Sequence, residues 1–119
     1  MVDQMIVGTG VDIIEIDRIE RAISKWGEMF LDHVFTNDEI VWARTHKFPY
    51  PHYAGRFAAK EAIFKALGDS RVTWLDLNIY NDASGKPVCQ YNKNIFEGHI
   101  YLSISHSKDY AVAQAIVTR

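Results

Sequence analysis

The chain has 119 residues, of which 48% are hydrophobic and 24% are charged, and its 13 basic and 15 acidic side chains give a net charge of −2. These values predict a single soluble domain over residues 1–119 that buries about two-thirds of its unfolded surface. The slightly acidic balance argues against nucleic acid as a partner, and no apolar run reaches the ~20 residues that a membrane span requires.

The single cysteine, Cys89, excludes an internal disulfide and fits a reducing compartment. The N-terminal segment contains Asp3 and Gly8 and has no basic stretch ahead of a long apolar core, so we expect no signal peptide. Together these features predict a cytoplasmic protein.

The N-terminal part of the chain is expected to form a strand followed by a helix. Residues 5–14 are rich in β-branched side chains and predict the strand. The helix is expected to begin at Asp17, with Glu20 as its capping partner, and to end at Gly27. Its predicted buried face repeats at helical spacing and consists of Ile16, Ile19, Ile23 and Trp26.

Two further helices are expected, separated by a loop. A second capping box, Thr36-Asn37-Asp38-Glu39, opens a short helix that ends near Arg44. Two prolines make residues 46–52 a loop. Residues 53–67 are rich in Ala and lead to Gly68, which predicts a long helix that Gly68 ends.

The long helix combines apolar faces with one charged strip. On a helical projection Glu61 and Lys65 lie side by side between two apolar sectors. Those sectors consist of Ala58, Ala59, Ala62, Ile63, Ala66 and Leu67 on one side and Phe57 and Phe64 on the other. The residues alone favour an ordinary ion pair between Glu61 and Lys65, in the stabilising order at i and i+4. The apolar flanks count against that interpretation, because a solvated pair usually has polar neighbours.

The C-terminal part is expected to be built from strands. Period-two alternation predicts strands at residues 75–80 and 99–106, and a turn at 82–87 leads into a strand at 88–91. Residues 110–117, rich in Ala and Val, are expected to form the last strand. In the strand at residues 99–106, one face is shared by Ile100, Leu102, Ile104 and His106. The expected fold is therefore α+β: an N-terminal strand and helices followed by an antiparallel β-meander, with one long central helix packed on the sheet.

Several polar residues have two interpretations. Asp12, near the end of the first strand, is either a strand-end cap or a ligand, and His106 on an apolar face is more often a core histidine. Gly8 and Gly10 do not begin a dinucleotide-binding loop, because the GxGxxG motif requires a third glycine at position 13, where this chain has Ile13. The serines near His106 lack a nucleophile elbow, and the remaining histidines show no metal-ligand spacing.

The first helix carries a stripe of cations. Arg18, Arg21 and Lys25 lie within about 60° of one another on a helical projection. The stripe is either a solvated face or a surface that binds an acidic partner.

Three segments resemble one family: residues 8–13 (GTGVDI), 55–66 (GRFAAKEAIFKA) and 103–107 (SISHS). In these segments the chain is similar to the small 4′-phosphopantetheinyl transferases of the holo-acyl-carrier-protein synthase type. The resemblance extends over essentially the whole chain and implies transfer of 4′-phosphopantetheine from coenzyme A to a carrier-protein serine. It also implies a homotrimer with the active site between subunits.

The resemblance assigns expected roles to residues. It implies that Asp12 and Glu61 bind Mg²⁺ and that Lys65 neutralises or protonates the leaving phosphate, while the base is either Glu61 or a water of the magnesium shell. Positions near coenzyme A are expected to be Arg56, Lys65, Gly85, Lys86, Pro87, Ser105 and His106. The stripe of Arg18, Arg21 and Lys25 is expected to dock the acidic helix of acyl carrier protein.

Two other functions stay open on the sequence. One is a catalytically silent module that binds coenzyme A or the carrier, and it has no need of Asp12, Glu61 and Lys65 together. The other is a Mg²⁺-dependent nucleotide pyrophosphohydrolase, which has no need of a protein-docking stripe.

Overall fold

The computed structural model describes residues 4–119, so Asp3, used above to argue against a signal peptide, lies outside the described range. The helices are α1 (Ile16–Trp26), α2 (Glu28–Val34), α3 (Asn37–Arg44), α4 (Tyr50–Leu67) and the short 3-10 helix η1 (Trp74–Asp76). The strands are β1 (Ile6–Glu15), β2 (Asn78–Asn81), β3 (Pro87–Gln90), β4 (His99–His106) and β5 (Tyr110–Thr118).

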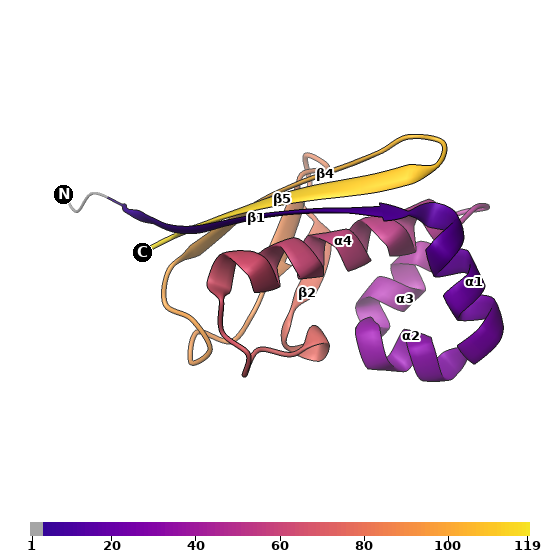
Figure 1. The fold of residues 1–119 in the computed structure, drawn as a ribbon, viewed down its shortest axis with the longest axis horizontal. Coiled ribbons are helices and arrows are strands. Elements are labelled where there is room, and N and C mark those ends of the chain that lie inside the picture. The colour runs from indigo at the N-terminus through magenta and orange to yellow at the C-terminus, as the bar shows by residue number, and fades with distance from the viewer. Residues whose placement is uncertain (1–3) are drawn as a thin grey trace.

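The strands form two antiparallel sheets, one of three strands in the order β1-β5-β4 and one of two strands, β2-β3. Helix α4 lies along one face of the larger sheet, and α1, α2 and α3 gather at one end of the molecule (Figure 1). The predicted α+β fold with a long helix packed on the sheet is confirmed. The strands nevertheless divide into two sheets, because β1 pairs with β5 and the β2–β3 hairpin stands apart.

Glycines allow β1 and α4 to approach closely. A Cβ atom at Gly8 would lie 1.9 Å from the carbonyl oxygen of Ala66, and one at Gly10 would lie 1.9 Å from that of Ala62. Both alanines are buried, so backbone packs almost directly on backbone. The glycine pair therefore has a packing role, and residue Asp12 is held two positions along the same strand.

The start and the end of α1 differ from the prediction. The helix begins at Ile16, and its N-cap, Glu15, makes no side-chain cap bond. The proposed capping box at Asp17 is wrong, because β1 runs directly into the helix and Asp17 instead pairs with Arg21 at 3.1 Å. Trp26 is 53% exposed rather than buried, since Gly27 ends the helix there and turns the chain into α2.

The remaining elements follow the prediction closely, with three differences. The capping box at Thr36 and the left-handed Gly68 at the end of α4 are both present. Helix α2 was not predicted, α4 begins at Tyr50 within the expected loop, and the start of the strand expected at residues 75–80 is η1. Within residues 4–119 no helix is long and apolar enough to cross a membrane.

Candidate active site

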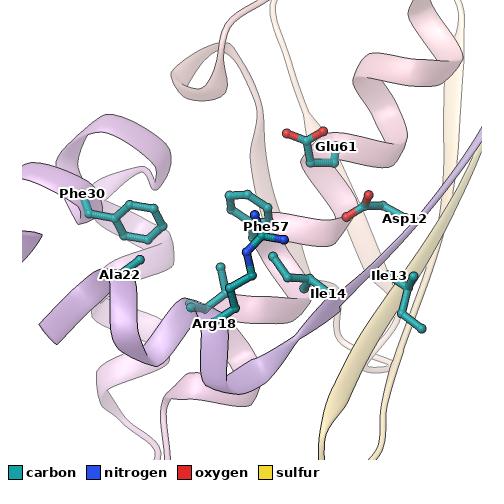
Figure 2. A pocket seen from close by; sticks show the side chains of 9 residues that line it. Asp12, Ile13, Ile14, Arg18, Ala22, Phe30, Phe57 and Glu61 are labelled. Atoms are coloured by element: carbon teal, nitrogen blue, oxygen red, sulfur yellow. The ribbon is translucent and has the colours of Figure 1, made fainter. Parts of the chain in front are cut away.

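A pocket of about 400 Å³ lies where β1, α1, α2 and α4 meet. Figure 2 shows Asp12 from β1 and Glu61 from α4 on one side of it, with Arg18 from α1 across from them. The full lining is Asp12, Ile13, Ile14, Arg18, Ile19, Ala22, Phe30, Phe57 and Glu61. The structure thus brings the two expected carboxylates together although they lie 49 positions apart in the sequence.

The environment of Glu61 disfavours its charged form. Burial raises the pKa of Glu61, the negative charge of Asp12 raises it further, and Lys65 lowers it. Asp12 has a side chain only 17% exposed. Two carboxylates that repel each other in one partly buried pocket are an arrangement that a bound cation stabilises.

Lys65 contacts Asp12 rather than Glu61. Its Nζ donates to the carbonyl oxygen of Val11 at 2.9 Å and to Oδ1 of Asp12 at 3.2 Å. Among the residues that the structure describes, no ion pair joins Glu61 and Lys65, so the simple i, i+4 pair is not the role of these side chains. The ammonium lies beside the pocket residue Asp12, and the Lys65 side chain is 53% exposed.

The donor set at the pocket fits a magnesium ion that shares its shell with a substrate. Within residues 4–119 no group of three or more His, Cys, Asp or Glu side chains could hold a metal ion by itself. Mg²⁺ is commonly bound by one or two carboxylates together with phosphate oxygens and water. Asp12 and Glu61 can supply the two carboxylates.

Arg56 is buried on α4, directly before the pocket residue Phe57 in the sequence. The guanidinium stacks 4.0 Å above the ring of Trp42, and Nη2 donates to Oδ1 of Asn81 at 3.2 Å. Its Nε has no partner, although the residue is only 5% exposed. Burial lowers the pKa of Arg56 to about 10, so the arginine remains charged and can bind an anion.

Two histidines that the sequence did not select lie next to Arg56. The rings of His46 and His52 are 3.7 Å apart, and the ring of His52 is 6.0 Å from that of His106 on β4. Burial lowers the pKa of His52 to about 4, with further lowering from His46, His106 and Arg56. The position of His52, one turn before Arg56 on α4, is the sequence signal that could have identified it.

Other expected site residues lie apart from this pocket. The turn at Gly85, Lys86 and Pro87 joins β2 to β3, where Asp82 accepts backbone bonds from Ser84 and Lys86. Ser105 is exposed on β4. Neither the turn nor Ser105 lines the pocket, so one copy of the chain does not assemble all the expected residues in one place.

The cation stripe of α1 is exposed, and one member reaches the pocket. Arg18 lines the pocket, Arg21 pairs with Asp17, and Nζ of Lys25 lies 4.9 Å from the ring centroid of Trp26. Exposed apolar side chains accompany these cations, namely Trp26 at 53% and Met29 at 75%. The sequence missed this mixed surface because it assigned Trp26 to the core.

Comparison with known proteins identifies a family. A family model described as the 4′-phosphopantetheinyl transferase superfamily matches residues 8–115. The holo-[acyl-carrier-protein] synthase of Protochlamydia amoebophila is 44% identical over an alignment that covers 94% of this chain and 98% of the relative.

Solved structures agree. The crystal structure of a Bacillus anthracis holo-(acyl-carrier-protein) synthase in complex with CoA (3′,5′-ADP) has a TM-score of 0.85 and 42% identity, covering 96% of this chain and 97% of that one. The Helicobacter pylori synthase in complex with coenzyme A has a TM-score of 0.83 and 29% identity, covering 92% of this chain and 98% of that one.

Proposed function

The chain belongs to the 4′-phosphopantetheinyl transferase superfamily, and from that premise we propose the reaction that its pocket performs. It transfers the 4′-phosphopantetheine group of coenzyme A to a serine of apo-acyl carrier protein and releases adenosine 3′,5′-bisphosphate. The convergence of Asp12 and Glu61 on one pocket beside Arg18 carries this proposal, because it joins a candidate metal site to the exposed cations of α1.

Asp12 and Glu61 would hold Mg²⁺. The raised pKa of Glu61, caused by burial and then by Asp12, supports this assignment. When bound, Mg²⁺ neutralises charge on the pyrophosphate of coenzyme A. Asp12 is oriented for this role by its bond from Lys65.

Lys65 would act on the leaving phosphate, and Glu61 would take up the serine proton. The serine hydroxyl attacks the β-phosphorus, and the bond between that phosphorus and the oxygen leading to the adenosine part breaks. Lys65, exposed beside the pocket residue Asp12, stabilises or protonates the departing phosphate. Glu61 is suited to accept the serine proton, because burial and then the charge of Asp12 raise its pKa and make the carboxylate a stronger base.

The phosphates of coenzyme A would be held by Arg56 and His106. The Nε of Arg56, which has no hydrogen-bond partner in a residue only 5% exposed, supports an anion beside it. Gly85, Lys86 and Pro87 in the exposed β2–β3 turn are proposed to contact the nucleotide. Ser105 is proposed to contribute from a neighbouring copy, since it does not line the pocket of its own chain.

Acyl carrier protein would dock on the exposed stripe of Arg18, Arg21 and Lys25. Its acidic helix would pair with the three cations, and Trp26 and Met29 would supply apolar contacts. Arg18 connects the two surfaces, because it belongs to the stripe and also lines the pocket.

A homotrimer would complete the site. The face of the larger sheet opposite α4 is uncovered among residues 4–119 (Figure 1) and carries Val11 and Ile13, which are 59% and 64% exposed. Such apolar side chains on an open sheet face are typical of a surface that a second copy covers. We place the enzyme in the cytoplasm, where the buried free thiol of Cys89 stays reduced.

Intact-mass spectrometry of apo-acyl carrier protein, incubated with this protein, coenzyme A and Mg²⁺, tests the proposal. The carrier should gain one phosphopantetheine, and EDTA should prevent the gain. Incubation without carrier separates the alternatives: a pyrophosphohydrolase would cleave coenzyme A alone, whereas a silent binding module would leave both substrates unchanged. Either result would overturn the proposed function.

A further inference from the structure

A fully buried ion pair joins Lys60 on α4, the residue that precedes Glu61, to Glu39 on α3. Nζ of Lys60 lies 2.7 Å from Oε1 of Glu39, and both side chains are 0% exposed. The helical projection of the sequence assigned no role to Lys60. The structure places it in the core with a carboxylate from α3.

Every proton of the Lys60 ammonium has an acceptor. Besides Glu39, Nζ donates to the carbonyl oxygen of Val34 at 2.8 Å and to that of Trp74 at 2.9 Å. Val34 ends α2 and Trp74 begins η1. Lys60 therefore ties α4 to three other elements through one atom.

Glu39 extends the network to the β2–β3 hairpin. Its Oε2 accepts a bond from the backbone N–H of Ile79 on β2 at 2.7 Å, and Oε1 also accepts from the N–H of Thr36 at 2.8 Å. The hairpin that β2 begins carries the Gly85-Lys86-Pro87 turn. The pair thus connects the helix turn that bears Glu61 to the hairpin proposed to contact the nucleotide.

The same hydrogen-bond network also holds a cluster of aromatic side chains that forms one wall beside Glu61. The ring of Trp74 stacks on Phe57 with centroids 5.0 Å apart and meets Phe64 edge-on at 4.9 Å. Phe57 precedes Glu61 by four residues and lines the same pocket. Because Lys60 holds the Trp74 carbonyl, the position of this aromatic wall depends on the buried ammonium.

Stability alone does not explain such a pair. Moving two charges from water into a core is costly, and replacing a buried ion pair with apolar side chains is often neutral or stabilising. We infer that Lys60 and Glu39 are positioning residues, which fix Glu61 and its turn of α4 relative to α2, η1 and β2. This inference rests on the proposed function, because it assigns the pair a purpose in the transfer reaction.

The test compares Lys60→Met, Glu39→Gln and the double variant in the transfer assay. Lys60→Met should lower the unfolding midpoint strongly, because it leaves a buried carboxylate without its partner. The double variant should recover most of that midpoint but not the kcat, which should stay at least about tenfold below the wild-type value. Its KM for the carrier should change by less than about twofold, while the Mg²⁺ concentration for half-maximal rate should rise.

A matched control is the exposed pair of Arg44 and Glu28, which also joins two helices and has an N–O distance of 2.9 Å. Neutralising it with Arg44→Met and Glu28→Gln should leave kcat and the Mg²⁺ requirement unchanged. A double variant at Lys60 and Glu39 with wild-type kcat and Mg²⁺ requirement would overturn the inference.

The design separates this inference from the proposed function. If the wild-type protein transfers no phosphopantetheine, the proposed function fails; if it does and the double variant matches it, only the positioning role fails. Should the double variant not fold, Glu39→Gln alone decides, because it retains both bonds from Lys60 to carbonyl oxygens. An unchanged Mg²⁺ requirement in that variant would then count against the inference.

Discussion

At the scale of single residues, Glu61 is a carboxylate held where its charge is unfavourable. Burial and the charge of Asp12 both raise its pKa. Such a group contributes little to folding as a carboxylate, so its presence beside a second carboxylate points to chemistry. Removing the charge of Glu61 should therefore lower the activity without lowering the free energy of unfolding.

Glu61→Gln should abolish transfer while leaving the fold intact. We expect the rate to fall by about a hundredfold or more, because the substitution removes one of the two carboxylates that we propose hold Mg²⁺. The unfolding free energy should stay within about 0.5 kcal/mol or rise, since repulsion with Asp12 disappears. The transfer assay and urea denaturation measure the two effects, with exposed Asp32→Asn as the control. More than a tenth of the wild-type rate would remove Glu61 from the metal site.

His52 gives the protein a defined response to acid. Its pKa is lowered from 6.5 to about 4 in the folded state, chiefly by burial. The unfolded state therefore binds the proton first as the pH falls below about 6.5, and stability is lost until about pH 4. We expect this site to remove on the order of 1 kcal/mol over that window, after allowance for solvent screening.

Urea denaturation at several pH values checks this expectation. His52→Gln should lose less unfolding free energy than the wild type between about pH 7 and about pH 4.5, because the side chain no longer takes up a proton. His33→Gln, at an exposed position on α2, is the control. Parallel pH profiles for the wild type and His52→Gln would show that the imidazole cluster does not couple to folding.

At the scale of elements, the contact between β1 and α4 builds the site. The close approach at Gly8 and Gly10 sets β1 against the helix, and Asp12 follows on the same strand while Glu61 lies on the helix. The distance between the two carboxylates therefore depends on backbone packing rather than on any local motif.

Gly10→Ala should disrupt both the fold and the site. The new Cβ would lie 1.9 Å from the carbonyl oxygen of Ala62, which forces β1 away from α4. We expect a loss of about 3 kcal/mol in unfolding free energy and a reduced transfer rate in the folded fraction. Thr9→Ala, at an exposed position of the same strand, should change neither. A Gly10→Ala protein with wild-type stability would mean that the two backbones separate easily.

Elements with strong local signals were predictable from the sequence. The capping box at Thr36 and the glycine at position 68 marked real helix ends. Helix α2 had no such signal: it spans seven residues, has no side-chain cap and buries only Leu31 and Val34. Local rules also favoured a cap at Asp17, which fails because the chain passes from strand to helix without a turn.

The site was predictable only in part, because its geometry is tertiary. Residue patterns left Asp12 undecided and treated Glu61 and Lys65 as an ion pair, whereas Lys65 reaches across to Asp12. The family resemblance brought these residues together before the structure did. The burial of Lys60 escaped every pattern, since it depends on Glu39 and on two carbonyl groups distant in the sequence.

At the scale of the whole molecule, the pocket and the cation stripe share Arg18. Charge reversal at Arg18 and Arg21 should therefore raise the KM for acyl carrier protein by about tenfold or more, with a smaller effect at high salt because exposed charges are screened. Steady-state transfer kinetics at two ionic strengths measure this. Lys93→Glu, at an exposed position of the loop before β4, is the control. Equal KM values for the wild type, the charge-reversal variant and this control would place docking elsewhere.

The uncovered sheet face makes the last prediction, which concerns assembly. Register sets Ile13 beside Val112 on β5, and Val112 beside Ser105 on β4, so an exposed apolar side chain lies in the same cross-strand row as an expected coenzyme A residue. A copy packed on this face would bury Ile13, which is 64% exposed, and would bring Ser105 to another chain. Ile13→Lys should block that packing, because the ammonium would have to be desolvated.

Light scattering coupled to gel filtration measures the outcome. The wild type should have three times the mass of one chain, and Ile13→Lys should have the mass of one chain. Val41→Lys removes a comparably exposed apolar side chain, 57% exposed on α3, and should remain trimeric and active. A wild-type protein that is both monomeric and fully active would show that one chain completes the site, and Ser105 would then have no part in binding coenzyme A.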